Sequence, residues 1–214
     1  RPDGVLLLQD IKRATTRIVG NGSASLWDIG DGVVCLEFHT KMNSIDPGIM
    51  AMVEKVLKVV PAENYKALII HSEAANFSVG ANIGLALFAA NIAGWPEITK
   101  SIKAGQDAYQ ARKYAPFPVV GAPSGMALAG GLEILLHCDA VQAHAETYMG
   151  LVEVGVGLVP AWGGCKEMLA RWHHNPKGPQ GPMPAVTRVF ETIGTAAVAR
   201  SADEARDLLY LRDG

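Results

Sequence analysis

Two glutamates stand alone in apolar, glycine-rich stretches of this 214-residue chain. Glu133 lies in residues 125–139, two positions after a Gly-Gly pair, and Glu153 lies in residues 149–160. A lone carboxylate is costly to bury. Two carboxylates that meet raise each other's proton affinity, so one can hold a proton while the other is ionised. If the fold brings them together, they form a proton donor and a water-activating base in one pocket.

Each glutamate also has a simpler interpretation, and the sequence leaves both open. Glu133 can complement the N-terminal end of a helix dipole. Glu153 can pair with a buried arginine or lysine. The occurrence of both favours chemistry, because an isolated glutamate is seldom fully buried.

Two turns rich in small residues offer a second kind of chemistry, carried by the backbone. They are residues 78–81 and 129–131, each predicted to lead from a strand into a helix or loop. Free N–H groups at such turns can point at one carbonyl oxygen and stabilise an oxyanion. The alternative is that these glycines only permit close packing of the backbone.

Composition argues against several other classes of function. The net charge of −2 and the absence of a basic stripe do not favour a nucleic-acid partner. Three scattered cysteines predict no disulfide framework and a reducing, cytoplasmic location. No run of 18 apolar residues predicts a membrane span. No metal-ligand spacing of histidines and no dinucleotide-binding glycine motif is present, so neither a metal nor a bound cofactor is expected.

The elements that must position these residues alternate irregularly between strands and helices, which predicts an α/β fold. Predicted strands are 25–29, 33–38, 67–71, 119–120, 140–143 and 147–149. Predicted helices are 46–61 (with an Asp cap and Pro at its first position), 97–113, 131–138, 163–173, 185–198 and 202–209. Residues 84–98 and 174–184 are predicted loops.

Four segments in order resemble the crotonase (enoyl-CoA hydratase/isomerase) superfamily. They are residues 76–82 (Asn-Phe-Ser-Val-Gly-Ala-Asn), 118–133 (ending Gly-Gly-Leu-Glu), 153–164 (ending Pro-x-x-Gly-Gly) and 201–206 (Ser-Ala-Asp-Glu-Ala-Arg). The resemblance extends from Ser25 to Leu211. It implies a ClpP/crotonase-like fold, in which stacked ββα repeats form a spiral with helices outside.

The resemblance also implies roles for particular residues. The N–H groups of Ala81 and Gly130 would hold the thioester oxygen of an acyl-CoA, and Glu133 and Glu153 would handle the water and the α-proton. The substrate and CoA contacts that it implies are Lys41, Asn43, Val79, Ala81, Asn82, Ile83, Gly131 and Pro160. For Lys41, an ordinary solvated lysine is the preferred interpretation from the sequence, because exposed lysine is the norm.

Three positions depart from the family pattern. Asn82 stands where the family usually has Asp, Ala129 replaces the first of three glycines, and Gly84 stands where some members have a lysine near the CoA phosphates. These departures concern the CoA contacts and leave the two glutamates intact.

A finer resemblance points to the hydratase-type domain of bacterial fused 3-hydroxyacyl-CoA dehydrogenases. Residues 39–43, residues 148–158 and the lead-in from Ser25 carry it. It implies that residues 1–23 are a lead-in from a preceding dehydrogenase portion. Residues 24–214 would then be a hydratase/isomerase domain with a truncated C-terminal helical tail. NAD is expected only in the dehydrogenase portion, and the expected contacts are with that portion or with further copies.

The expected function is therefore hydration of an enoyl-CoA in fatty-acid β-oxidation, with no membrane or nucleic-acid partner. Two alternatives remain: a non-catalytic module that binds acyl-CoA, or another crotonase chemistry such as thioester hydrolysis or Δ3-Δ2 isomerisation.

Overall fold

The computed structural model describes residues 5–212, and two sheets organise it. The larger sheet has the strand order β1-β2-β3-β4-β5-β7, and the smaller has the order β6-β8-β9. The strands are β1 (Val19–Gly20), β2 (Ala24–Gly30), β3 (Val33–Phe38), β4 (Ala67–His71), β5 (Val119–Ala122), β6 (Met126–Leu128), β7 (Ala140–Val141), β8 (Tyr148–Gly150) and β9 (Val198–Ala199).

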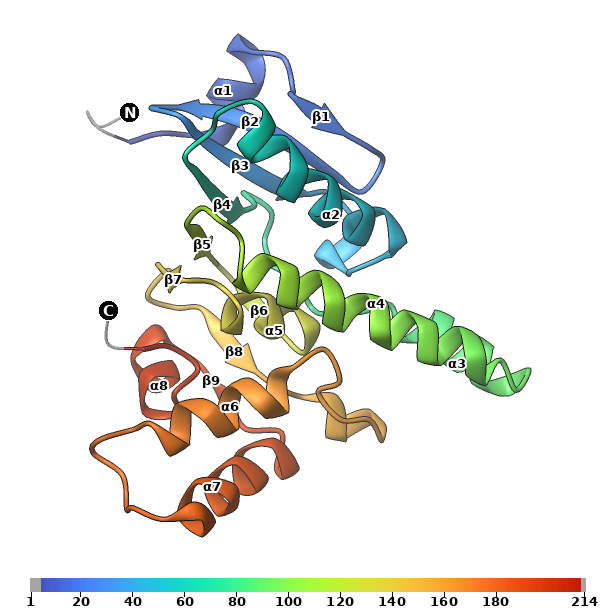
Figure 1. Ribbon diagram of the computed structural model, residues 1–214, viewed down its shortest axis with the longest axis vertical. Helices are drawn as coiled ribbons and strands as arrows, with labels where there is room; N and C mark the ends of the chain where they lie inside the picture. Colours follow the sequence, from blue (N-terminus) through green and yellow to red (C-terminus); the bar gives the residue numbers. More distant parts are fainter. Residues whose placement is uncertain (1–4, 213–214) are drawn as a thin grey trace.

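Eight α-helices and two short 3-10 turns connect the strands within these residues. The helices are α1 (Leu8–Ala14), α2 (Pro47–Ala62), α3 (Ile83–Asn91), α4 (Trp95–Lys113), α5 (Gly130–Leu136), α6 (Gly164–His173), α7 (Pro182–Gly194) and α8 (Ala202–Asp207). The 3-10 turns are η1 (Lys41–Asn43) and η2 (Glu153–Val156). Figure 1 shows the larger sheet at one end of the molecule, α6, α7 and α8 at the other, and α5 between them.

The larger sheet changes from antiparallel to parallel along its width. β1, β2 and β3 form antiparallel pairs, whereas β3-β4, β4-β5 and β5-β7 are parallel. The parallel part requires helical crossovers, and these are α2 between β3 and β4, the α3–α4 segment between β4 and β5, and α5 between β5 and β7. This is the α/β architecture that the alternation of elements predicts.

Helix α2 shows how a local sequence produces one of these crossovers. Asp46 caps it by accepting the Ile49 N–H at 2.8 Å, and Pro47 occupies the first turn. Apolar residues at helical spacing then form one buried face, comprising Ile49, Met52, Val53, Val56 and Val60. The predicted helix is confirmed, although Pro61 lies within its last turn and does not end it.

Some sequence predictions are wrong at element boundaries. Residues 84–98, predicted as a loop, contain α3 and the start of α4. The sequence of α3 is almost uniformly apolar and therefore carries no helical periodicity. None of its residues is buried. Helix α7 begins at Pro182, inside the predicted loop 174–184, and it ends at Gly194, before the predicted end at residue 198. The last residue of that predicted helix, Val198, instead begins β9, which pairs with β8.

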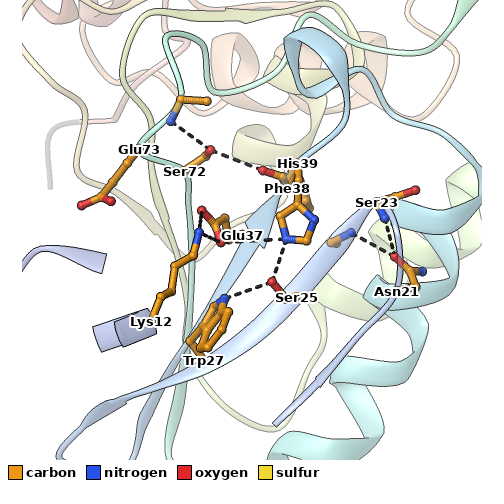
Figure 2. Close-up of polar contacts among 12 residues, drawn as sticks. Lys12, Asn21, Ser23, Ser25, Trp27, Glu37, Phe38, His39, Ser72 and Glu73 are labelled. Atoms are coloured by element: carbon orange, nitrogen blue, oxygen red, sulfur yellow. Dashed lines mark hydrogen bonds and ion pairs between the residues drawn. The ribbon is translucent and has the colours of Figure 1, made fainter. Parts of the chain in front are cut away.

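The described part of the lead-in folds onto the larger sheet. The Glu73 carboxylate accepts the N–H groups of Leu8 and Gln9, at 2.8 and 3.0 Å, and so holds the start of α1. Further along α1, the Lys12 ammonium donates to both Glu37 carboxylate oxygens at 2.9 Å (Figure 2). Among residues 5–212, no helix is both long enough and apolar enough to cross a membrane.

A polar cavity of about 470 Å³ lies beside this contact, and its lining includes neither Glu133 nor Glu153. Its buried groups already have partners. Ser25 accepts from the Trp27 indole at 3.0 Å and is bonded to His39 Nε2 at 2.7 Å (Figure 2). We therefore interpret the cavity as part of the packing of α1 against the sheet.

Candidate functional site

Glu133 projects from a helix that the backbone packs unusually tightly. Every residue of α5 is buried. The helix can lie this close to the turn at residues 78–81 because residue 131 is a glycine, and a Cβ there would collide with the Ser78 carbonyl oxygen. Glu133 is only 2% exposed, and its Oε1 accepts the Gly164 N–H at 2.7 Å.

Burial controls the proton affinity of Glu133. It raises the pKa of this carboxyl to about 7, the Gly164 N–H opposes the rise by stabilising the anion, and the Glu153 carboxylate adds to it. Glu133 thus takes up a proton close to neutral pH.

Glu153 comes from a different segment of the chain. It is the first residue of η2, shortly after β8, and it is half-buried. Its Oε2 is buried with no hydrogen-bond partner in the described chain. Burial raises the pKa of Glu153, also to about 7.

The two carboxylates lie close enough for the charge of Glu153 to act on Glu133, and that they work as an acid/base pair stays a prediction. The charge of Glu153 raises the pKa of Glu133. Burial is the largest cause of the raised pKa of the Cys165 thiol on α6, and both carboxylates add to that rise. Neither glutamate has an ion-pair partner among residues 5–212, so the alternative of a buried Glu153 salt bridge is not found there. The arrangement can hold one proton between two carboxylates near neutral pH.

The two predicted backbone turns lie against each other. Gly80 adopts a φ of +88°, and a Cβ there would stand 2.8 Å from Ala129 Cβ and 2.9 Å from Gly130 N. Ile45 fixes the first turn, because its N–H donates to the Gly80 carbonyl at 2.8 Å and its carbonyl accepts from Asn82 N at 3.3 Å. Glycine is therefore needed here for close approach, as the alternative interpretation holds.

Close packing does not use up the donors of these turns. In the described chain, neither the Ala81 nor the Gly130 N–H donates to a protein acceptor. Gly130 begins α5, so its N–H has no partner within the helix. Both groups remain available to an oxygen atom of a ligand.

Aromatic side chains that the sequence reading did not single out surround Gly130. The Tyr109 hydroxyl donates to the Gly130 carbonyl at 3.1 Å. A Cβ at Gly130 would lie 3.0 Å from the Trp162 ring, which packs edge-on against Tyr109 with centroids 5.5 Å apart. These contacts hold the backbone on both sides of the expected oxyanion donor.

The remaining predicted contact residues divide into two groups. Lys41, Asn82 and Ile83 are exposed around the turn at Ala81, while Val79 is half-buried beside it. Asn82 caps α3 by accepting the Gly84 N–H at 3.1 Å. Their predicted contacts with CoA stay predictions.

The second group is engaged in packing. Asn43 is 1% exposed, its side-chain amide donates to the Asn76 carbonyl at 2.9 Å, and its own carbonyl accepts from Ser78 Oγ at 2.7 Å. Gly131 faces Ser78, as described above. Pro160 is buried against Gly164, where a Cβ would meet its ring at 2.8 Å.

Gly164 is the partner that the sequence reading missed. Its signal was present in the Gly-Gly pair that opens α6, but the partnership with Glu133 joins residues 31 positions apart. Nothing in the local sequence marks which N–H will meet which carboxylate.

Comparison with known proteins agrees with this geometry. A family model described as Enoyl-CoA hydratase/isomerase matches residues 28–173. The "Probable 3-hydroxyacyl-CoA dehydrogenase" of Bacillus subtilis (strain 168) is 42% identical over 206 residues, which are 96% of this chain and 26% of that protein. The "Fatty acid oxidation complex subunit alpha" of Vibrio vulnificus (strain CMCP6) is 33% identical over 134 residues, 61% of this chain and 19% of that protein.

The fold also matches solved structures. The crystal structure of an enoyl-CoA hydratase from Bacillus anthracis superposes with a TM-score of 0.72 at 22% identity, covering 88% of this chain and 68% of that one. The chain spans about a quarter or less of the length of the curated relatives cited above.

Proposed function

Because the chain belongs to the enoyl-CoA hydratase/isomerase family, we propose that it adds water across the 2,3 double bond of an enoyl-CoA. The observation that carries the proposal is the pair of buried Glu133 and half-buried Glu153, each with its pKa raised to about 7. Such a pair supplies a base and an acid at the same pH. Its position in a crotonase fold beside two unused N–H groups supports a thioester as the substrate.

The reaction follows from this arrangement. The ionised glutamate takes a proton from water, and the resulting hydroxide adds to the β-carbon of the enoyl thioester. The electron pair of the double bond moves toward the thioester oxygen, where the Ala81 and Gly130 N–H groups stabilise the enolate charge. The protonated glutamate then gives its proton to the α-carbon. One proton is taken up and one is released, so the pair ends with the proton count it began with.

The two N–H donors carry the electrostatic part of this proposal. Losing one oxyanion donor typically costs about 3 kcal/mol of transition-state stabilisation. Trp162 and Tyr109 would preserve that contribution by fixing Gly130. The reaction needs no metal and no bound cofactor, since both protons and the charge are handled by these groups.

The wider context belongs to the same proposal. The relatives' names support a place in a fatty-acid oxidation enzyme that also contains a 3-hydroxyacyl-CoA dehydrogenase portion, where NAD would bind. The lead-in up to residue 23 would then connect that portion to the hydratase domain. Three free cysteines support a reducing cytoplasm.

Hydration of crotonyl-CoA by the purified chain tests the proposal. Glu133→Gln and Glu153→Gln keep the side-chain shape but remove the acid or base, so we expect each to lower kcat by about 10²- to 10⁴-fold. Glu146→Gln is the matched control, because Glu146 is exposed on a loop. Unchanged activity in either site variant would refute the assigned roles.

Product analysis separates the alternatives. Tight binding of an acyl-CoA without turnover would indicate a non-catalytic module. Release of free CoA would indicate thioester hydrolysis, and conversion of a 3-enoyl-CoA to the 2-enoyl isomer would add Δ3-Δ2 isomerase activity.

A further inference from the structure

A buried ionic cluster lies behind the turn that holds Glu133, and the proposed reaction does not use it. Its centre is Glu167, in the first turns of α6, with a side chain only 4% exposed. The Lys113 ammonium, at the end of α4, donates to both Glu167 oxygens at 2.6 and 2.7 Å. Lys166 adds a further contact at 2.9 Å. A cluster this costly to desolvate must be held by good geometry.

His137 lies between this cluster and Glu133. Its Nδ1 lies 2.8 Å from the Glu133 backbone carbonyl. Because a carbonyl only accepts, Nδ1 carries the proton, and Nε2 is left 3.6 Å from Glu167 Oε1. Burial lowers the pKa of His137 to about 4, which keeps the ring neutral at neutral pH.

The same ring supports the turn that donates to Glu133. Gly163 has a φ of +121°, and a Cβ there would stand 2.6 Å from His137 Cε1. The next N–H, that of Gly164, is the one that reaches Glu133 Oε1 at 2.7 Å. Glu167 is anchored to this turn, since its own N–H donates to the Gly163 carbonyl at 2.9 Å.

We propose that Glu167 is a positioning residue, which with Lys113 clamps the Gly163–Gly164 turn against α4 and α5 so that the Gly164 N–H points at Glu133. The proposal rests on the proposed function, in which Glu133 exchanges protons. Glu167 touches neither the substrate nor Glu133 itself. It acts through one backbone hydrogen bond.

A distinctive consequence concerns the direction of a pH shift. The Gly164 N–H stabilises the ionised Glu133, so a relaxed turn would raise the pKa of this carboxyl. The titratable and charged groups around Glu133 come from each packed element: Glu153 on η2, Cys165 on α6, His137 beside α5, and Tyr109 with the Arg112 stacked on it from α4. Glu167→Gln leaves all of these groups in place; His137 senses the lost charge, but the loss lowers its pKa further, so its ring stays neutral.

A purely electrostatic role for Glu167 predicts the opposite direction. Removing its negative charge would make ionisation of Glu133 easier and would lower its pKa. Removing the positive charge of Lys113 would raise that pKa. A positioning role instead predicts that loss of either partner raises it.

The test is the pH–rate profile of crotonyl-CoA hydration for Glu167→Gln and Lys113→Met. We expect the limb that belongs to Glu133 to move to higher pH by about one unit in both variants. We also expect kcat to fall by roughly 10- to 100-fold, with KM nearly unchanged. Lys113→Arg, which retains the ion pair, should stay close to the wild type. Lys103→Met, which breaks an exposed ion pair with Asp107 on the same helix, is the matched control.

A shift of Glu167→Gln to lower pH, or no shift at all, would overturn the proposal. Titration of the Glu133 carboxyl by ¹³C NMR measures the same pKa shift without turnover. A wild type that does not hydrate crotonyl-CoA would therefore defeat the proposed function while leaving the clamp testable. If Lys113→Met does not fold, Glu167→Gln decides alone, because only its expected direction separates the two roles. If Glu167→Gln does not fold either, native-state hydrogen exchange of the Gly164 amide is compared between Lys113→Arg and the wild type. Equal and strong protection supports a clamp that the retained ion pair maintains. Weak protection in the wild type contradicts the clamp.

Discussion

Burial sets the proton affinity of Glu133 and Glu153 more than their mutual repulsion does. Desolvation is the largest cause of the raised pKa in both carboxyls. Glu133 retains one backbone donor, whereas a buried oxygen of Glu153 has no partner in the described residues. The two sites therefore share a pKa of about 7 but differ in how the charged form is stabilised. In the proposed reaction, that difference would let one carboxyl serve as the acid while the other serves as the base.

Ala129 carries strain at the entrance to α5. Its φ of 50° and ψ of −127° lie in a region that residues with a Cβ rarely adopt. Such strain costs on the order of 1–3 kcal/mol. We expect Ala129→Gly to raise the free energy of unfolding by about 1 kcal/mol, after the greater entropy of an unfolded glycine is subtracted. Urea unfolding monitored by circular dichroism measures it.

Ala104→Gly provides a contrast of opposite sign. Ala104 lies exposed in the middle of α4, where glycine should lower stability by about 1 kcal/mol. Destabilisation in both variants would show that Ala129 is not strained.

The residues themselves predicted the acid/base pair, but they could not predict its surroundings. A carboxylate in an apolar run is visible in one segment of sequence. The Gly164 donor and the Tyr109 support depend on contacts between segments 31 and 21 positions apart. Asn43 shows the same limit, because its polar side chain turns out to hold the backbone of Asn76.

At the scale of elements, sequence pattern predicted those that have one buried face. Helix α2 follows its expected periodicity. Strand β4 is confirmed as well, although it was predicted from a continuous apolar run and only alternate residues of it are buried. Helix α3 differs, since its apolar residues are exposed on all sides and produce no period. Strand β9 is two residues long and exists through its pairing with β8, so only tertiary structure could reveal it.

The attachment of α1 is a second property of an element, and it depends on one carboxylate. Glu73 satisfies two N–H groups at the start of a seven-residue helix that is too short to be stable alone. We expect Glu73→Ala to increase amide hydrogen exchange in residues 8–14 by about 30-fold, because the two lost hydrogen bonds are worth about 1 kcal/mol each. Exchange measured by mass spectrometry resolves this segment.

Glu63→Ala is the matched control for that experiment. Glu63 is exposed at the end of α2, and it lies far in the sequence from these N–H groups. If exchange in residues 8–14 were equal in the two variants, Glu73 would not hold α1. Activity should change little in Glu73→Ala, since α1 contacts neither of the proposed catalytic carboxylates in its described hydrogen bonds.

At the scale of the whole molecule, the catalytic pair should reduce stability as the pH rises. A carboxyl whose pKa is higher in the folded than in the unfolded state stabilises the fold fully below its unfolded pKa. That contribution is lost as the pH rises through the folded value. For Glu133 and Glu153 the pH range over which this stability is lost runs from the ordinary carboxyl pKa of 4.5 to about 7. Glu167 and His137 have lowered pKa values and act in the opposite sense.

A comparison of wild type with the Glu133→Gln/Glu153→Gln double variant isolates the pair, because Glu167 and His137 are common to both proteins. We expect the stability of the wild type relative to the variant to fall between pH 5 and pH 8. The fall should be about 3 kcal/mol from Glu133 and less from Glu153, whose side chain is partly solvated. Urea unfolding at several pH values, with equal m-values as the check for two-state behaviour, measures the difference. A relative stability that is flat across this range would mean that the carboxylates stay ionised in the folded protein, and neither could then donate a proton near neutral pH.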